Sequence, residues 1–153
     1  MHDPLTGLLT RGAFFEICDG EIARVRRSGH SMALIMADLD HFKGVNDRYG
    51  HLAGDDVLRE TARRLKATFR RGDAIGRFGG EEFVALAVGC LREDAVGLAE
   101  RFRQSICNEP IVTSAGRLGV TTSVGVAVLH NLDTASALLK GAGEALYRAK
   151  GGG

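Results

Sequence analysis

Apolar residues recur at helical spacing in four stretches of the chain. The first covers residues 11–27, where Thr10 is placed to cap the helix and Ser28-Gly29-His30 is a typical helix end. The others cover residues 52–69, 95–106 and 135–150, and the pattern predicts one apolar face on each helix. The face positions are Phe14, Phe15, Cys18, Ile22 and Val25; Leu58, Ala62, Leu65 and Phe69; Ala95, Leu98, Ala99, Phe102 and Ile106; and Ala135, Leu138, Leu139, Ala142, Ala145, Leu146 and Ala149.

Shorter apolar runs between these helices indicate strands. Residues 33–37 are uninterruptedly apolar, which is typical of a strand buried on both faces. Residues 73–78 and 83–88 flank Gly79-Gly80, a dipeptide that favours a two-residue hairpin turn because both glycines tolerate a positive φ. Residues 110–112 and 118–129 complete the set. The order predicts an α+β fold, a ferredoxin-like βαββαβ core with an additional helix and strands, as one domain over residues 1–153.

Composition narrows the class of protein. Lys+Arg 20 against Asp+Glu 19 gives a formal net charge of +1, so there is no basic excess of the kind that non-specific nucleic-acid binding needs. Three cysteines without close spacing predict neither a disulfide framework nor a zinc site, and they favour a reducing compartment such as the cytoplasm. No apolar run approaches the roughly 18 residues of a membrane span. The terminal Gly151-Gly152-Gly153 is interpreted as a truncation point rather than a fold element.

Two pairs of acidic residues stand at the ends of predicted strands. Asp38 and Asp40 follow the buried strand 33–37, and Glu81 and Glu82 follow the glycine pair. The first and third strands of a βαββαβ sheet usually lie side by side, which would bring Asp38 to Glu81. Two converging carboxylates suit Mg²⁺, because without a cation they would repel each other. The simpler alternatives are a solvated hairpin tip and an Asp40 that caps the next helix.

A polar, turn-rich segment, residues 41–51, follows the first strand. The backbone N–H groups of His41, Phe42 and Lys43 would point outward at a helix start, where a phosphate binds well. The helix is expected to resume at Leu52, with a solvated basic face formed by Arg59, Arg63, Arg64 and Lys66. A metal beside a phosphate site indicates phosphoryl or nucleotidyl transfer.

Six ordered motifs resemble the GGDEF domains, the diguanylate cyclases. The first three are Asp38-Leu39-Asp40-His41-Phe42-Lys43, the run Asn46-Asp47 to Gly50-His51 to Gly54-Asp55, and Arg77-Phe78-Gly79-Gly80-Glu81-Glu82-Phe83. The others are Asp3-Pro4-Leu5-Thr6-Gly7-Leu8, Ser123-Val124-Gly125-Val126-Ala127 and Ala145-Leu146-Tyr147-Arg148-Ala149-Lys150. The resemblance covers essentially the whole chain, and six motifs at the family spacing are specific.

The resemblance implies condensation of two GTP into cyclic di-GMP with release of two pyrophosphates, in a transient homodimer with one GTP per subunit. It implies that Asp38, the Leu39 carbonyl and Glu81 bind Mg²⁺, or Mn²⁺ in its place. Glu81 and Asp38 are the expected catalytic residues, with Glu81 also proposed as the general base. A carboxylate bound to a cation is a weak base, which counts against that second role.

The resemblance also implies how the nucleotide is held. Asn46 and Asp55 would read the guanine, and Lys150 would join His41, Phe42 and Lys43 at the phosphates. A carboxylate accepts from both the N1–H and the 2-amino group of guanine. The remaining expected active-site residues are His51, Gly79, Gly80 and Glu82.

An R-x-x-D pair, Arg70 and Asp73, stands at the spacing of the family's inhibitory product site, and Arg101 is a more distant candidate. A guanidinium forks onto a guanine edge or a phosphate, and Asp73 would accept from guanine N1. The alternative is a surface turn with an i,i+3 ion pair.

Two departures from the family pattern leave a second function open. The acid usually found before Ala-Leu-Tyr is missing in Ala142-Gly143-Glu144-Ala145, and no arginine follows Lys150 before the sequence ends at Gly153. The alternative to a cyclase is a catalytically silent GTP or cyclic di-GMP receptor module. We expect the chain to be part of a longer protein with an upstream sensor or receiver domain.

Overall fold

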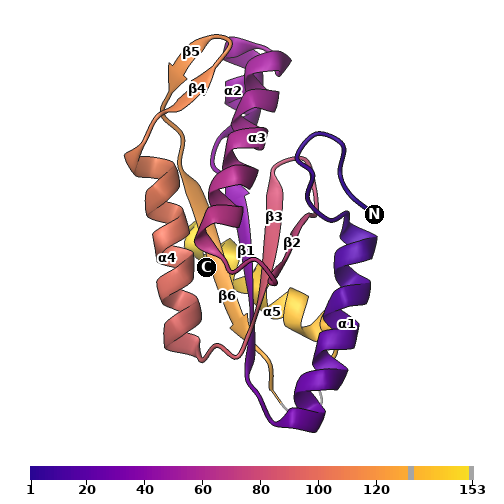
Figure 1. Ribbon diagram of the computed structural model, residues 1–153. Helices are drawn as coiled ribbons and strands as arrows, with labels where there is room; N and C mark the ends of the chain where they lie inside the picture. Colours follow the sequence, from indigo (N-terminus) through magenta and orange to yellow (C-terminus); the bar gives the residue numbers. More distant parts are fainter. Residues whose placement is uncertain (131–132, 152–153) are drawn as a thin grey trace.

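The computed structural model describes residues 1–130 and 133–151, so Gly152 and Gly153 of the expected truncation point lie outside the described residues. Four strands form one antiparallel sheet in the order β2-β3-β1-β6 (Figure 1). They are β1 (Met32–Leu39), β2 (Ala74–Arg77), β3 (Glu82–Val88) and β6 (Thr122–Val128). The order confirms the ferredoxin-like core, with β1 and β3 as central neighbours. A separate hairpin pairs β4 (Ile111–Thr113) with β5 (Gly116–Leu118).

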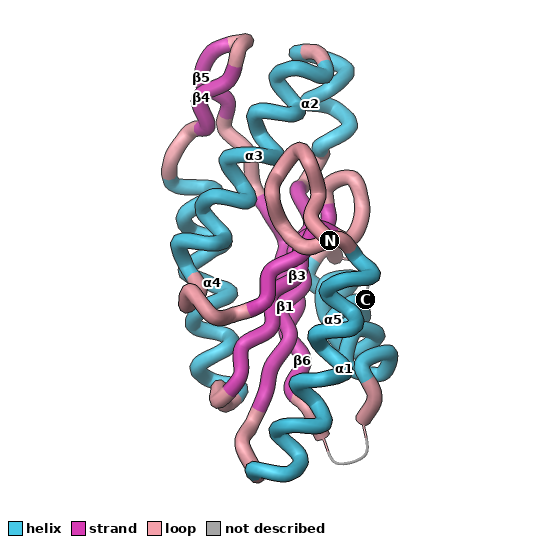
Figure 2. The backbone as a smooth tube through the Cα atoms, turned by 45° about the vertical axis from the view of Figure 1, so that its right-hand side comes forward, coloured by secondary structure: helices cyan, strands magenta, loops and turns pink. Residues whose placement is uncertain are grey.

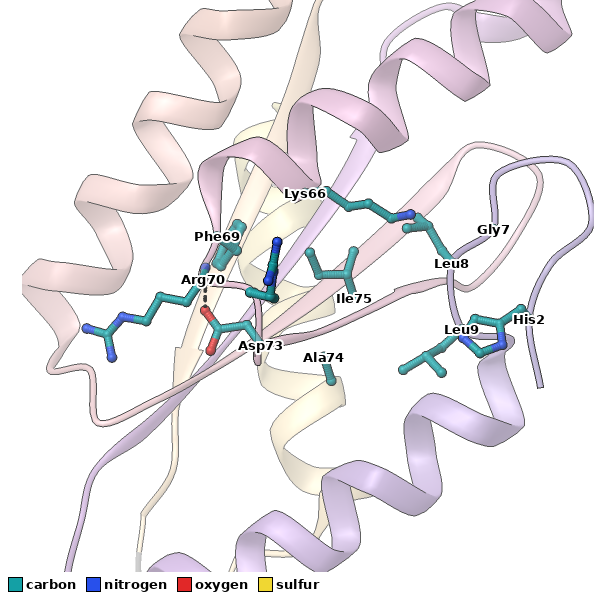
Figure 3. Close-up of a pocket in the computed structure, with 11 residues that line it drawn as sticks. His2, Gly7, Leu8, Leu9, Lys66, Phe69, Arg70, Asp73, Ala74 and Ile75 are labelled. Carbon is teal, nitrogen blue, oxygen red and sulfur yellow. Dashed lines mark hydrogen bonds between the residues drawn. The ribbon is translucent and has the colours of Figure 1, made fainter.

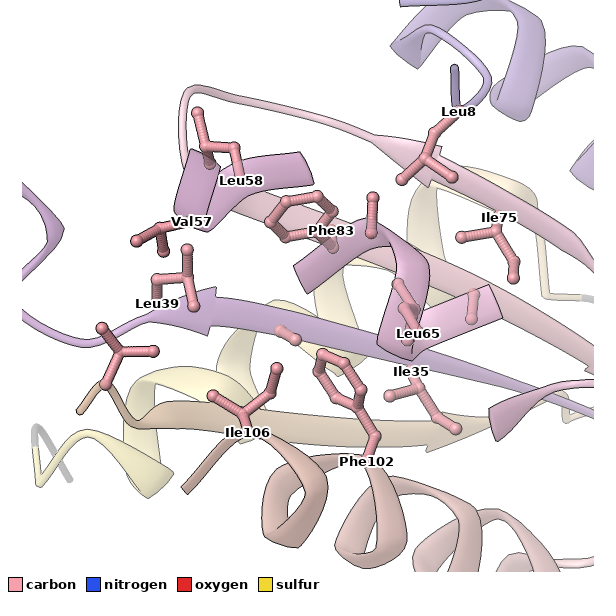
Figure 4. Close-up of a cluster of buried hydrophobic side chains, with 14 of the residues drawn as sticks. Leu8, Ile35, Leu39, Val57, Leu58, Leu65, Ile75, Phe83, Phe102 and Ile106 are labelled. Atoms are coloured by element: carbon pink, nitrogen blue, oxygen red, sulfur yellow. The ribbon is translucent and has the colours of Figure 1, made fainter. Parts of the chain in front are cut away.

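Helices cover both faces of the sheet (Figure 2). The helices α1 (Arg11–Ser28) and α5 (Ala135–Ala149) pack on one face, against Met32, Leu34 and Met36 of β1. The helices α3 (His51–Thr68) and α4 (Arg92–Asn108) pack on the other, against Ile35, Ala37 and Leu39. Figure 4 shows this second cluster, with Phe83 and Phe102 fully buried at its centre. The alternation along β1 therefore sends Asp38 and Asp40 toward the α1 and α5 face.

A separate short helix, α2 (Phe42–Tyr49), follows the expected helix start at residues 41–43, in a segment where the apolar pattern predicted no helix of its own. It begins after His41, whose φ of 56° is left-handed, and it is separated from α3 by Gly50 at φ 91°. That conformation is easy for glycine, so the chain turns there between two helices. Two apolar side chains, Phe42 and Val45, attach α2 to the core. So few apolar positions leave a weak periodic signal.

Two other expectations about strands and turns were wrong. Neither Gly79 nor Gly80 lies in the left-handed region, so the predicted two-residue turn does not form. The Phe78 N–H instead donates to the Glu82 carbonyl at 2.8 Å, and residues 79–81 make the tip. The predicted strand 118–129 is broken, because β5 ends at Leu118 and β6 begins at Thr122.

Arg64 does not belong to the solvated basic face predicted for α3. Its side chain is only 8% exposed, and its guanidinium donates to the carbonyls of Ser105, Glu109 and Pro110 at 2.7–3.1 Å. Those carbonyls lie at and just past the end of α4, which lacks further helix to satisfy them. Arg64 therefore ties α3 to the end of α4.

Among the described helices, none is long and apolar enough to cross a membrane.

Candidate functional site

The end of β1 and the tip of the β2–β3 hairpin meet at one edge of the sheet. Asp38 stands opposite Glu82 on one side and Ser123 on the other. The Leu39 N–H donates to the Glu81 carbonyl at 3.2 Å, which holds the hairpin tip beside β1. The structure thus brings together Asp38, Leu39 and Glu81, as the sheet topology predicted.

The negative charges of the carboxylates at this edge repel one another. Burial, together with the Glu81 and Glu82 charges, raises the pKa of Asp38, although Lys150 acts in the opposite direction. The Asp38 side chain is 18% exposed, so solvent screens these charges only in part. A positive charge placed among the carboxylates would relieve the repulsion.

This donor set fits a hard divalent cation. Mg²⁺ is commonly held by one or two carboxylates, with substrate phosphates and water supplying the other oxygens. Asp38, Glu81 and the Leu39 carbonyl would provide two carboxylates and one carbonyl. Within residues 1–130 and 133–151 no group of three His, Cys, Asp or Glu side chains is arranged for a metal, and the expected set contains only two such side chains.

Asp40 does not cap α2. The N-cap residue is His41, which makes no side-chain capping bond. The Asp40 carboxylate instead accepts hydrogen bonds from the hydroxyls of Thr121 and Ser123 and from the Lys150 ammonium. These three hydrogen bonds lower the pKa of Asp40 against the opposing effect of burial.

The start of α2 lies at the same edge of the sheet, because its N-cap residue His41 directly follows Asp40 in the chain. Its first N–H groups, from Phe42 onward, have no carbonyl of the helix before them to donate to. The Phe42 ring is buried, so this residue offers a ligand only its backbone. The Lys43 side chain is 91% exposed and reaches Asp47 at 3.3 Å. Unpaired N–H groups at a helix start suit an anion, and the phosphate-binding role of His41, Phe42 and Lys43 stays a prediction.

The predicted guanine residues lie on the two packed helices α2 and α3. Asn46 of α2 rests against Gly54, where an added Cβ would fall 1.8 Å from the Asn46 Oδ1. Gly54 immediately precedes the half-buried Asp55, so the amide and the carboxylate belong to one small region. His51 is exposed at the start of α3.

Two residues that received no role from the sequence hold the hairpin tip. The Arg77 guanidinium donates to the carbonyls of Gly79 and Gly80 at 2.8–3.2 Å and pairs with Asp3 at 3.1 Å. Asp3 is fixed in turn by the N–H and hydroxyl of Thr6. Gly79 leaves room for the Glu82 carboxylate, since a Cβ there would lie 2.7 Å from its Oε1. Both residues belong to ordered motifs, at residues 3–8 and 77–83, so a signal for them was present in the sequence.

Arg70, Asp73 and Arg101 lie away from this edge and line one cavity of about 610 Å³ beside α4. The Asp73 carboxylate accepts from the Arg70 N–H at 3.0 Å (Figure 3). The surface turn considered as an alternative does form, since the Asp73 N–H donates to the Arg70 carbonyl at 3.0 Å. Its ion pair does not, because neither arginine forms a salt bridge among the described residues. Burial raises the pKa of Asp73. Figure 3 also shows the neighbouring cavity, of about 550 Å³, on the other side of this turn.

Comparisons with known proteins place this architecture. The profile of the family "Diguanylate cyclase, GGDEF domain" matches residues 1–153. The diguanylate cyclase DgcP of Pseudomonas aeruginosa is 42% identical over the whole chain, which spans 23% of that relative's length. A sensory box/GGDEF family protein from Caulobacter crescentus superposes with a TM-score of 0.90 at 41% identity, with 99% of each chain covered.

A second solved structure adds a ligand. The GGDEF domain of DgcB from Caulobacter crescentus, in complex with c-di-GMP, superposes with a TM-score of 0.93 at 28% identity, covering 99% of this chain and 88% of that one. The family profile and these relatives extend over essentially all of the sequence. The chain therefore belongs to the diguanylate cyclase GGDEF-domain family.

Proposed function

We propose that this domain is a Mg²⁺-dependent diguanylate cyclase that condenses two GTP into cyclic di-GMP and releases two pyrophosphates. The observation that carries the proposal is the meeting of Asp38 and Glu81 at one sheet edge, beside the start of α2. Asp38, Glu81 and the Leu39 carbonyl would hold the cation. When bound, it would neutralise charge on the triphosphate and polarise the α-phosphate.

The remaining residues would orient the nucleotide. The N–H groups at the start of α2 and the side chains of Lys43 and Lys150 would bind phosphate oxygens. Asn46 and Asp55 would read the guanine edge, because a carboxylate pairs with the two adjacent donors that guanine carries. Each subunit would hold one GTP, and the 3′-hydroxyl of each would attack the α-phosphate of the other in a homodimer.

Glu81 is the candidate acceptor of the 3′-hydroxyl proton. Its position at the hairpin tip is fixed through the Leu39–Glu81 backbone bond and through the Arg77 clamp on the glycine carbonyls. A rigid tip favours catalysis, because a carboxylate must be within hydrogen-bond reach of the proton that it removes.

We also propose that product binds in the cavity lined by Arg70, Asp73 and Arg101 and inhibits the enzyme. The support is that one cavity is lined by the half-buried carboxylate of Asp73 and by two arginines that form no salt bridge among the described residues. The upstream sensor or receiver domain and the cytoplasmic location stay predictions.

Product analysis tests the main proposal. The purified domain, stripped of bound nucleotide, is incubated with GTP and Mg²⁺ at high protein concentration beside Glu81→Ala and, as a control, Glu16→Ala on the exposed face of α1. We expect cyclic di-GMP from the wild type and from the control and none from Glu81→Ala. If the proteins bind cyclic di-GMP but none of the three forms product, the domain is a cyclic di-GMP receptor module and not a cyclase.

A further inference from the structure

Asp40 is held more firmly than its neighbours at the sheet edge. Its carboxylate accepts from the Thr121 Oγ1 at 2.7 Å and the Ser123 Oγ at 2.8 Å. Its own N–H donates to the Thr121 carbonyl at 2.9 Å, so backbone and side chain are both tied to the start of β6. A carboxylate fixed by two hydroxyls is a rigid anchor for a positive charge.

The charge that it anchors is Lys150, at the end of α5. The Lys150 Nζ lies 2.8 Å from the Asp40 Oδ1 and 3.5 Å from the Asp38 Oδ1. The shorter contact is a charge-assisted hydrogen bond, whereas the longer one is only an ion pair. All three side chains are one-third exposed or less, at 33%, 21% and 18% for Lys150, Asp40 and Asp38.

We propose that Asp40 is a positioning residue that holds the Lys150 ammonium and thereby keeps the Asp38 carboxylate available to a divalent cation. The inference rests on the proposed function, because it assumes that Asp38 binds the cation. It gives a role to Asp40, and to the two hydroxyl residues Thr121 and Ser123.

The physical reason is competition between two cations for one carboxylate. A lysine has a flexible four-carbon stem, so its ammonium moves to whichever acceptor remains. Without the Asp40 charge, Lys150 would pair with Asp38 alone. It would then both occupy a ligand of the cation and repel it, and each effect weakens metal binding.

The test measures Mn²⁺ binding to the nucleotide-free protein by electron paramagnetic resonance. Asp40→Asn keeps the size of the side chain and an oxygen for the hydroxyls while it removes the charge. We expect it to raise the dissociation constant of Mn²⁺ about tenfold, the scale of one unit charge at a partly exposed site. Lys150→Met alone should tighten Mn²⁺ binding, and the double variant Asp40→Asn/Lys150→Met should return to near the wild-type affinity.

Lys140 provides the matched control, because it is an exposed lysine earlier on the same helix. Asp40→Asn/Lys140→Met should stay as weak as Asp40→Asn, which separates a local effect of Lys150 from a general change in net charge. An unchanged affinity in Asp40→Asn, or a loss that Lys150→Met does not reverse, overturns the inference. Should Asp40→Asn not fold, the Lys150→Met variant decides alone, and no tightening there overturns it.

The result can be separated from failure of the proposed function. If the wild type binds no Mn²⁺ at millimolar concentration, both the metal site and this inference are overturned. If the wild type binds Mn²⁺ but forms no cyclic di-GMP, only the catalytic proposal fails, and the pattern among the variants still decides the role of Asp40.

Discussion

Single charged residues in this domain do structural work that their position on a helix face conceals. Arg63 and Arg64 are neighbours on α3, yet only Arg64 is buried. Backbone carbonyls from the end of α4 surround its guanidinium. Glu60 accepts from both guanidiniums. Removing a partner from such a cluster costs more than the pair contributes, because the remaining charge stays buried.

Glu60 makes the stability of the domain depend on pH in an acidic window. Hydrogen bonds from Arg63 and then Arg64 lower the pKa of Glu60 to about 2, although burial opposes them. A lowered folded-state pKa stabilises the fold above the unfolded value of about 4.5, and this contribution is lost as the pH falls toward 2. We therefore expect Glu60→Gln to unfold at lower urea than the wild type at pH 7, and the difference to shrink between pH 4.5 and 2.

Glu16→Gln is the control for that series, since Glu16 is exposed on α1 and forms no salt bridge in the described chain. Its urea midpoint should follow the wild type at every pH. If the urea midpoint of Glu60→Gln runs parallel to that of the wild type over the whole pH range, Glu60 does not contribute to the pH dependence of stability.

Elements pack closely enough in this fold that one glycine decides whether a helix can lie on the sheet. Gly125 of β6 lies directly under α5, where an added Cβ would fall 2.2 Å from the Leu146 nitrogen and 2.4 Å from the Ala142 carbonyl oxygen. Both are backbone atoms, so no side-chain rotation relieves the contact. The helix end that carries Lys150 depends on this approach.

Gly125→Ala should therefore displace α5 and destabilise the domain by roughly 3 kcal/mol, the upper part of the usual cost of overpacking. Chemical denaturation measures the loss. Gly20→Ala is the control, because Gly20 lies in α1 with nothing within 4 Å of its added Cβ, and it should gain up to about 1 kcal/mol of helix stability. Equal stability of Gly125→Ala and wild type would contradict the close packing.

The elements also show what the sequence could and could not predict. Four helices and the central strands followed from periodicity, because each has a long apolar face such as Phe14 to Val25. The short helix α2 has only Phe42 and Val45 in the core, so its signal was lost among polar residues. The burial of Arg64 depends on carbonyls more than 40 positions away, and no local pattern records such a contact.

The candidate site divides in the same way. The meeting of Asp38 with Glu81 followed from fold topology, since strand order alone sets it. The partners of Asp40 did not, because a helix cap needs one local turn whereas Thr121, Ser123 and Lys150 arrive from other elements. The salt bridge between Arg77 and Asp3 likewise joins positions 74 apart in the chain, and no local pattern records such a contact.

At the scale of the whole molecule, the proposed catalytic and product sites lie at different ends of α3. Asn46 and Asp55 stand near its start, while Arg70 follows its end. We expect Arg70→Ala to weaken inhibition by cyclic di-GMP at least tenfold, because the fork that would bind phosphate or guanine is lost. Inhibition is measured against each variant's own initial velocity. The control is Arg71→Ala, because Arg71 is the neighbouring exposed arginine outside that cavity, and this variant should keep wild-type inhibition. An unchanged affinity of Arg70→Ala for cyclic di-GMP would overturn the proposed product site.

The proposed reaction finally requires two copies of the chain. A 3′-hydroxyl that attacked the α-phosphate of its own nucleotide would close a ring within one nucleotide, whereas cyclic di-GMP joins two nucleotides through two phosphodiester bonds. The proposed site of one subunit would hold one GTP, so a second copy of the chain must supply the other. Apolar side chains are exposed where α2 ends and α3 begins, Tyr49 at 37% and Leu52 at 76%, and so small an apolar surface favours a transient dimer. The rate of cyclic di-GMP formation should therefore rise more steeply than linearly with protein concentration while the monomer predominates, and approach linearity once dimers form. Initial rates from nanomolar to high micromolar protein, at saturating GTP, measure this.

Strict linearity down to nanomolar protein would have one of two causes. One is a tight dimer, which sedimentation at the same concentrations would reveal. The other is a reaction completed within one chain, which would overturn the two-subunit mechanism.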